Sequence, residues 1–155
     1  MKTVLVLCFI VFLLGCAEPI HQAQEGDTMK LTSPAFVHEG SIPSRHTCDG
    51  EDVSPSLIIS DVPANAKSLV LIMDDPDVPK HLRADGMWDH WIRFNIPVRT
   101  RDILSGDEPG VAGKGTGGNL GYKGPCPPDR EHRYFFKLYA LDVVSSLLSD
   151  GRTSR

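Results

Sequence analysis

The sequence has little of what builds helical domains and little of what binds nucleic acids. Before residue 143, no segment repeats apolar residues at the 3.6-residue spacing of an amphipathic helix. The net charge is −4, whereas nucleic-acid binding needs a basic patch or stripe. No internal repeat or low-complexity tract is present, and 155 residues suffice for one domain but not for two. These absences favour a single small domain with few helices and no nucleic-acid partner.

Turn-forming residues are, by contrast, abundant. Twelve prolines and fourteen glycines favour short strands joined by turns. Apolar runs rich in β-branched and aromatic residues mark the strand candidates. The strongest candidates are residues 68–73, 91–96 and 133–141, and weaker ones are 57–59 and 29–32. The sequence therefore predicts a mostly β domain, a β-sandwich or β-sheet domain with few helices.

The first fifteen residues have the features of a secretory signal. Lys2 supplies a positive charge, and the eleven apolar residues from Val4 to Leu14 are too few to span a bilayer, which needs about 20. A Leu-Leu-Gly sequence then precedes Cys16, which resembles the lipobox of bacterial lipoproteins. The resemblance implies cleavage of residues 1–15 and a thioether-linked diacylglycerol on Cys16. An ordinary signal peptide that contains a cysteine is the alternative.

Residues 16–29 are polar and without pattern, so we expect them to form a lipidated tether. Two or three acyl chains, such as palmitate, hold a protein stably on a membrane, whereas one chain binds only marginally. Ala17, and not aspartate, follows Cys16, which by analogy with lipoprotein sorting favours the outer membrane. The expected location is the bacterial cell envelope, with the protein lipid-anchored and facing the periplasm.

Two cysteines remain once the signal and the lipid anchor are set aside. Cys8 leaves with the signal and Cys16 is lipidated, which leaves Cys48 and Cys126. An exported pair is permitted to oxidise. The sequence does not show whether their Cα atoms come within bridging distance, so a disulfide and two free thiols both stay open.

Three polar clusters lie at the ends of strand candidates. Taken singly, each is typical of a solvated acidic turn or of a histidine packed in a core. Taken together, they indicate a small site with several hydrogen-bond donors and an acidic side. The clusters supply Asp75 and Asp77 after the first strand, His90 at the start of the second, and His132 and Tyr134 at the start of the third.

Period-two counting predicts which face of its strand each ring occupies. It places His90 with Ile92, Phe94 and Ile96, on the face opposite Trp91, Arg93 and Asn95. It places His132 and Tyr134 with Phe136 and Leu138. We therefore expect three loops to bring both imidazoles, the phenol and the two acids around one cavity.

Seven short motifs follow one another within residues 30–142. They are Thr47-Cys-Asp-Gly-Glu-Asp-Val-Ser-Pro55, Asp75-Pro-Asp-Val-Pro79, Trp88-Asp-His-Trp91, Asn95-Ile-Pro97, Gly124-Pro-Cys-Pro-Pro128, His132-Arg-Tyr134 and Leu138-Tyr-Ala-Leu-Asp142. In this order they resemble the phosphatidylethanolamine-binding protein family, and its bacterial Raf kinase inhibitor-like branch in particular.

The resemblance implies a β-sandwich with few peripheral helices and an anion pocket at one end. It implies a binding protein for a phosphate or phospholipid headgroup, with no chemistry of its own, no cofactor and no metal. Imidazole and phenol groups can donate charge-assisted hydrogen bonds to phosphate oxygens. The residues that match the family's pocket are the donors His90, His132 and Tyr134, the acids Asp75 and Asp77, and the walls Pro79 and Pro128.

Two other functions fit the same residues. Some relatives regulate kinases or proteases, so the chain could regulate or inhibit an unnamed exported protein. Two histidines and two aspartates could also ligate zinc in a metal-dependent hydrolase, although their spacing matches no metalloprotease helix and no Gly-x-Ser-x-Gly motif is present. The glycines of residues 113–118 fit a dinucleotide-binding pattern, but no βαβ unit surrounds them, so we expect a turn or flexible loop.

The sequence departs from the family at its end. After Asp142 only thirteen residues follow, whereas family members usually continue into a helix and a final strand near the pocket. We expect residues 143–155 to be a short tail without regular structure, left by truncation, frameshift or loss. We also expect His132→Ala to remove most anion affinity without unfolding the domain.

Overall fold

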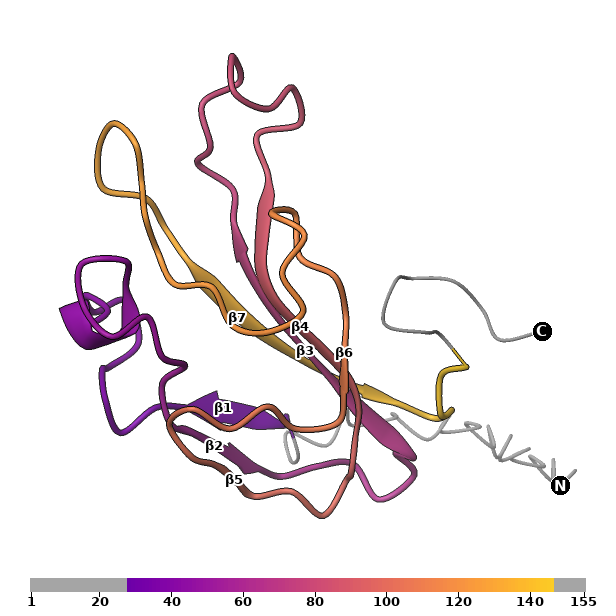
Figure 1. Ribbon diagram of the computed structural model, residues 1–155. Helices are drawn as coiled ribbons and strands as arrows, with labels where there is room; N and C mark the ends of the chain where they lie inside the picture. Colours follow the sequence, from indigo (N-terminus) through magenta and orange to yellow (C-terminus); the bar gives the residue numbers. More distant parts are fainter. Residues whose placement is uncertain (1–27, 147–155) are drawn as a thin grey trace, which may run out of the picture.

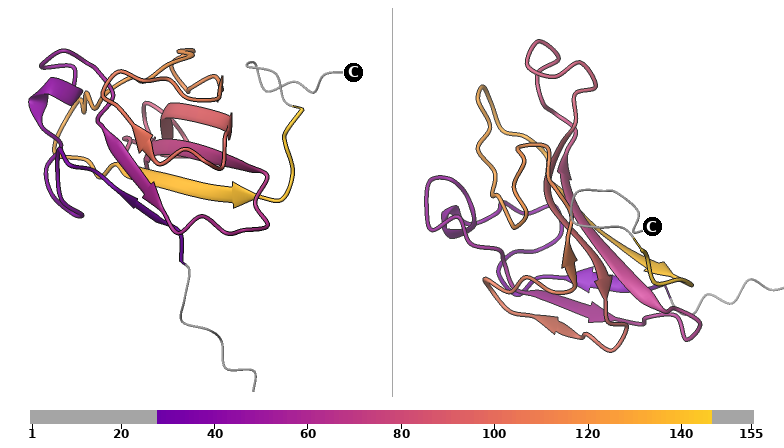
Figure 2. Two further views of the ribbon diagram at one scale, coloured as in Figure 1. Left: turned by 90° about the horizontal axis from the view of Figure 1, so that it is seen from below. Right: turned by 45° about the vertical axis from the view of Figure 1, so that its right-hand side comes forward.

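The computed structural model describes residues 28–146 and shows two antiparallel β-sheets packed face to face (Figures 1 and 2). One sheet has the strand order β1-β2-β5 and the other β6-β4-β3-β7. The strands are β1 (Lys30–Thr32), β2 (Leu57–Ser60), β3 (Ser68–Asp75), β4 (Trp88–Ile96), β5 (Asp102–Ile103), β6 (Val111–Ala112) and β7 (Phe135–Leu141). A single 3-10 turn, Ser44–His46, is the only helical element in this part of the chain. The predicted mostly β sandwich is confirmed.

The core lies between the two sheets. Alternate residues of β3 (Leu69, Leu71 and Met73) are fully buried, as the pleat of a strand with one covered face requires. Leu57 and Ile59 of β2 meet them from the opposite sheet. On β7, Phe136, Leu138 and Ala140 pair directly with Met73, Leu71 and Leu69 and complete the packing on that side, and Tyr134 packs against the same cluster. The predicted shared face of Tyr134, Phe136 and Leu138 is thus confirmed.

The predicted faces of β4 are wrong because the strand contains two bulges. Met73 pairs with Trp91 and Asp74 with Asp89, so His90 is an extra residue in the ladder. A second irregularity lies before Ile96, where Asn95 has a φ of 54°. As a result Trp91 and Ile96 share the core face, whereas simple alternation places them on opposite faces.

The glycine-rich segment after β6 is held closely against β4. Thr116 donates its backbone N–H to the Asp89 carbonyl, and Gly113 donates to the Ile92 carbonyl. A Cβ at Gly113 would lie 2.4 Å from a methyl carbon of Ile92, so only glycine allows this approach. The segment has turns and no helix or strand, as expected, but its hydrogen bonds fix it in place.

The segment after β7 is bound to β4. Ser145 exchanges two hydrogen bonds with the Asn95 side chain, each of 2.8 Å, so the start of the predicted tail is attached to β4. Residues 147–155 lie outside the described part, as do the predicted signal, Cys16 and most of the tether within residues 1–27. From residue 28 to residue 146, no helix has the length and apolar character needed to cross a bilayer.

Candidate functional site

The predicted site residues gather at one end of the four-stranded sheet. In Figure 1 the loop that follows β3 and the loop that leads into β7 extend from the same end of this sheet. The first loop carries Asp77, directly beyond Asp75 at the end of β3. The second loop carries His132 and Tyr134, because β7 begins at Phe135. The topology makes β3 and β7 neighbours, so the two loops meet.

His132 lies between two carboxylates. Its Nδ1 is 2.7 Å from an oxygen of Asp75, and its Nε2 is 2.8 Å from an oxygen of Asp129. The Asp75 and His132 side chains are almost completely buried, whereas the Asp129 side chain is 42% exposed. The solvent side of the imidazole is therefore capped by Asp129.

This arrangement favours the imidazolium form of His132. Burial by itself lowers the pKa of His132, but the hydrogen bonds to Asp75 and Asp129 outweigh it and raise the pKa above its ordinary value. The same contact with His132 lowers the pKa of Asp129. Both ring nitrogens then act as donors, and both are already engaged by the protein's own acids.

Asp77 is used in a different way from Asp75. It accepts hydrogen bonds from the backbone N–H of Arg133 at 2.9 Å and from two guanidinium nitrogens of Arg133 at 2.8 and 2.7 Å. The side-chain and backbone hydrogen bonds of Arg133 hold the pKa of Asp77 far below its usual range. Asp77 also donates its backbone N–H to Asp75, which joins the two acids in one turn. Asp75 therefore holds His132, and Asp77 holds Arg133.

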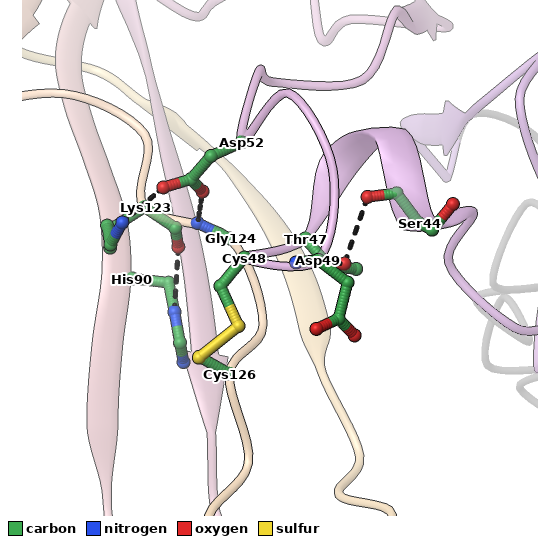
Figure 3. Close-up of a disulfide and its surroundings, with 9 residues drawn as sticks. All are labelled: Ser44, Thr47, Cys48, Asp49, Asp52, His90, Lys123, Gly124 and Cys126. Atoms are coloured by element: carbon green, nitrogen blue, oxygen red, sulfur yellow. Dashed lines mark hydrogen bonds and ion pairs between the residues drawn. A yellow bond between two sulfur atoms is a disulfide. The ribbon is translucent and has the colours of Figure 1, made fainter.

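His90 reaches the cluster from the bulge of β4. Its Nδ1 donates a 2.7 Å hydrogen bond to the backbone carbonyl of Lys123, which leaves Nε2 at the opposite side of the ring (Figure 3). Burial lowers the pKa of His90 in spite of that bond. At neutral pH the ring is uncharged, with Nε2 as a hydrogen-bond acceptor.

Tyr134 lies between the two imidazoles. Its ring centroid is 5.3 Å from that of His90, in an edge-to-face arrangement, and 6.5 Å from that of His132. Its hydroxyl oxygen is buried and has no hydrogen-bond partner. Burial, with the charges of Asp75 and Asp77, raises the pKa of Tyr134, so the phenol keeps its proton. The hydroxyl is a buried donor without an acceptor, which is uncommon in folded proteins.

A disulfide fixes the segment that carries Lys123. Cys48 and Cys126 are bridged, with a Cα–Cα distance of 5.4 Å, so the question left open by the sequence is settled in favour of the bond. Asp52 accepts a hydrogen bond from the Gly124 N–H at 2.6 Å and forms an ion pair with Lys123 (Figure 3). These contacts hold the carbonyl that orients His90.

An open groove of about 1050 Å³ reaches the cluster from one side. His132 and Tyr134 line it, and most of the remaining wall is apolar, including Phe36, Ile42 and Phe136. The groove does not touch His90, Asp75 or Asp77, and its prolines are Pro125 and Pro127. Of the two predicted wall residues, Pro79 is half-buried and caps a turn through its carbonyl, and Pro128 is exposed.

Two residues of the site escaped the sequence analysis. Arg133 stands inside the His132-Arg-Tyr134 motif, but its partner Asp77 is 56 residues away in the sequence, so spacing gives no signal of the pair. Asp129 lies three residues before His132 in an exposed loop, where spacing gives no signal of contact. Among residues 28–146, no group of three or more His, Cys, Asp or Glu side chains is arranged to hold a metal ion.

Comparison with known proteins identifies the family. Residues 32–154 match the family model described as "Phosphatidylethanolamine-binding protein". The chain belongs to the phosphatidylethanolamine-binding protein family. A Chlamydia pneumoniae member, named a UPF0098 protein, is 51% identical over 117 residues, which cover 75% of this chain and 78% of the relative. A UPF0098 protein of Methanothermobacter thermautotrophicus is 48% identical over 126 residues and covers 77% and 80% of the two chains.

Solved structures of this family share the fold. A crystal structure of a phosphatidylethanolamine-binding protein homologue from Chlamydia trachomatis superposes with a TM-score of 0.76 at 49% identity, over 78% of this chain and 80% of that one. The E. coli protein YbcL, described as a member of the mammalian phosphatidylethanolamine-binding protein family, gives a TM-score of 0.71 at 28% identity, over 81% and 84%. The clustered histidines, tyrosine and acids described above therefore lie in a fold of the phosphatidylethanolamine-binding protein type.

Proposed function

We propose that this protein binds a small phosphate-bearing anion at His132 and Tyr134, with the neutral ring of His90 beside them as an acceptor for a protonated phosphate oxygen. One observation carries the proposal: the Tyr134 hydroxyl is a buried donor with no acceptor, and it lies between two imidazoles. Leaving such a group unpaired is unfavourable by about 1–3 kcal/mol, so a phosphate oxygen that accepts a hydrogen bond from it would remove this cost. Nothing in this proposal requires a chemical step, and we assign the protein no catalytic activity.

The groove supports a ligand larger than inorganic phosphate. It is mostly apolar and is lined by His132 and Tyr134, so a ligand with an anionic head at these residues would also contact apolar surface. A phospholipid headgroup with part of its acyl chain has this character. The family membership and the Thr47–Pro55 motif support placing the chain in the bacterial Raf kinase inhibitor-like branch.

Calorimetric titration with inorganic phosphate and with phosphoethanolamine tests the binding. We expect Tyr134→Phe to weaken either ligand by about tenfold or more, since it removes one hydrogen bond to a charged group. Equal affinity for the two ligands would identify free phosphate as sufficient, and tighter binding of phosphoethanolamine would identify the headgroup. Unchanged affinity in Tyr134→Phe, or no binding of either ligand to the wild type, would contradict the proposal.

We further propose that acylated Cys16 tethers the domain to the cell envelope, on the outer membrane facing the periplasm. The apolar run ahead of Leu-Leu-Gly-Cys16 supports the anchor, and the disulfide supports an oxidising compartment. Cys16→Ser should move the protein from the membrane fraction to the soluble fraction. Cys8→Ser, which alters the signal but not the acylation site, is the matched control and should leave the distribution unchanged. Retention of Cys16→Ser in membranes would contradict the anchor.

A further inference from the structure

We infer that the carboxylate of Asp129 occupies the anion position on His132 in the ligand-free protein, so that a bound phosphate displaces it. Asp129 is then the residue that sets the affinity of the site, as an internal competitor for the ligand. This inference rests on the function proposed above and adds the identity of the group that the ligand must replace.

The geometry distinguishes Asp129 from the other acid on His132. The Asp75 carboxylate is buried and is also fixed by the backbone N–H of Asp77, so it belongs to the framework of the site. Asp129 contacts Nε2 from the solvent side, and its side chain is 42% exposed. Its other oxygen is 2.8 Å from exposed Arg130. Of the two carboxylates, only that of Asp129 can leave without opening the core.

The charges are compatible with this exchange. The acids Asp75, Asp77 and Asp129 are balanced by the cations His132, Arg133 and Arg130 while Asp129 is in place. Departure of Asp129 leaves two acids against three cations and frees one N–H of a buried imidazolium, which is a strong donor to an oxyanion.

The cost of displacement is small enough for a ligand to meet. Asp129 is held by one hydrogen bond to His132 and by an ion pair with exposed Arg130. Such partly exposed contacts contribute less than those of a fully buried pair. The loop itself is exposed from Cys126 to Glu131, so Asp129 can move with it. A phosphate group that replaces the carboxylate can also accept from the Tyr134 hydroxyl, which Asp129 leaves unpaired. The ligand therefore satisfies one more buried donor than the residue it displaces.

The test compares phosphate affinity in the wild type, Asp129→Asn, Asp129→Ala and Glu131→Gln. Glu131 is the matched control, because it is an exposed acid of the same groove as His132 whose side chain is not the hydrogen-bond partner of His132, and its change alters the net charge equally. We expect both Asp129 variants to bind inorganic phosphate and phosphoethanolamine roughly 3- to 10-fold more tightly than the wild type. We expect Glu131→Gln to bind as the wild type does.

A second measurement separates competition from a change in folding. In the ligand-free protein, Asp129→Asn should bring the pKa of His132 back toward its ordinary value, as followed by NMR, because one of the two carboxylates that raise it is gone. Tighter binding by Glu131→Gln to the same degree, or unaltered affinity in both Asp129 variants, would overturn the inference while the proposed function stands. Absence of phosphate binding in all four proteins would overturn both.

Discussion

Arg133 binds Asp77 through three donors, its backbone N–H and two guanidinium nitrogens, at 2.7 to 2.9 Å. This contact ties the turn after β3 to the residue between His132 and Tyr134. A bidentate guanidinium–carboxylate pair has a defined geometry that a single lysine contact lacks. The pair therefore fixes the relative position of two of the loops that form the site.

Arg133→Gln should return the pKa of Asp77 toward its ordinary value. The folded-state pKa is lowered, so the stability that Asp77 contributes is present above the ordinary carboxyl pKa and is lost as the pH falls through the lower, folded value. Carbonyl-carbon NMR of Asp77 and unfolding midpoints between pH 2 and 6 measure both effects. Arg130→Gln, on the same loop, is the control and should leave the pKa of Asp77 nearly as low as in the wild type.

The two histidines should titrate in opposite directions. We expect the pKa of His132 above the ordinary value of about 6.5 and that of His90 below it. The stability from His132 is complete below pH 6.5 and is lost as the pH rises through its raised pKa. The stability that His90 contributes is complete above pH 6.5 and is lost as the pH falls through its lowered pKa.

Imidazole NMR titration and urea unfolding between pH 5 and 9 test this pair. His90→Asn keeps a donor near the position of Nδ1 and should remove the acidic decline in stability, whereas His132→Asn should remove the alkaline one. If both rings titrated with the same pKa, the buried surroundings of His90 and the two carboxylates on His132 would not be present in solution.

His132→Ala should weaken the fold as well as the binding site. It leaves Asp75, only 3% exposed, as a buried acid without its cation, and breaking a buried pair in this way costs about 3 kcal/mol or more. Tyr134→Phe should instead leave the unfolding free energy unchanged or slightly higher, because it deletes an unpaired buried hydroxyl. Chemical denaturation of the two variants side by side decides the matter, and a His132→Ala domain as stable as the wild type would be the contrary result.

Loss of the disulfide should lower stability by about 4 kcal/mol. Cys48 and Cys126 are 78 residues apart, so the bond restricts a large loop of the unfolded chain. Both cysteines are exposed and open to a reducing agent. The ring N–H of His90 should also exchange faster with solvent on reduction, because Lys123 lies on the tethered segment. Reductant should have no effect on a Cys48→Ser, Cys126→Ser double variant.

Local sequence patterns were sufficient to predict five of the seven strands, but not the two-residue strands β5 and β6 or the faces of β4. The run at residues 68–73 predicts a buried strand, and β3 extends from Ser68 to Asp75. Alternation gives the correct face for Tyr134, Phe136 and Leu138 because β7 pairs with β3 without interruption. It fails on β4, since a bulge inserts one residue without any mark in the order of polar and apolar side chains.

The site was predictable where motifs name the residues and not where the partners come from loops. The proximity of Asp75 to His132 follows from matching the family motifs, and the sequence interpretation took His132 as a free donor. The structure shows that the protein itself engages both ring nitrogens. Such occupation depends on how the loop of Asp129 folds back, which no periodicity or composition encodes. The expectation that His132→Ala spares the fold therefore overlooked the buried pair.

The bulge at His90 makes the length of β4 as important as its composition. From Trp91 onward the strand supplies side chains to the hydrophobic interior, and His90, the extra residue of the bulge, lies with its ring against that of Tyr134. Deletion of a single residue at this point would preserve every apolar side chain of the interior, yet it would put the histidine out of phase with its neighbours. Insertions and deletions here should therefore be tolerated less well than substitutions, even though the fold itself could survive them.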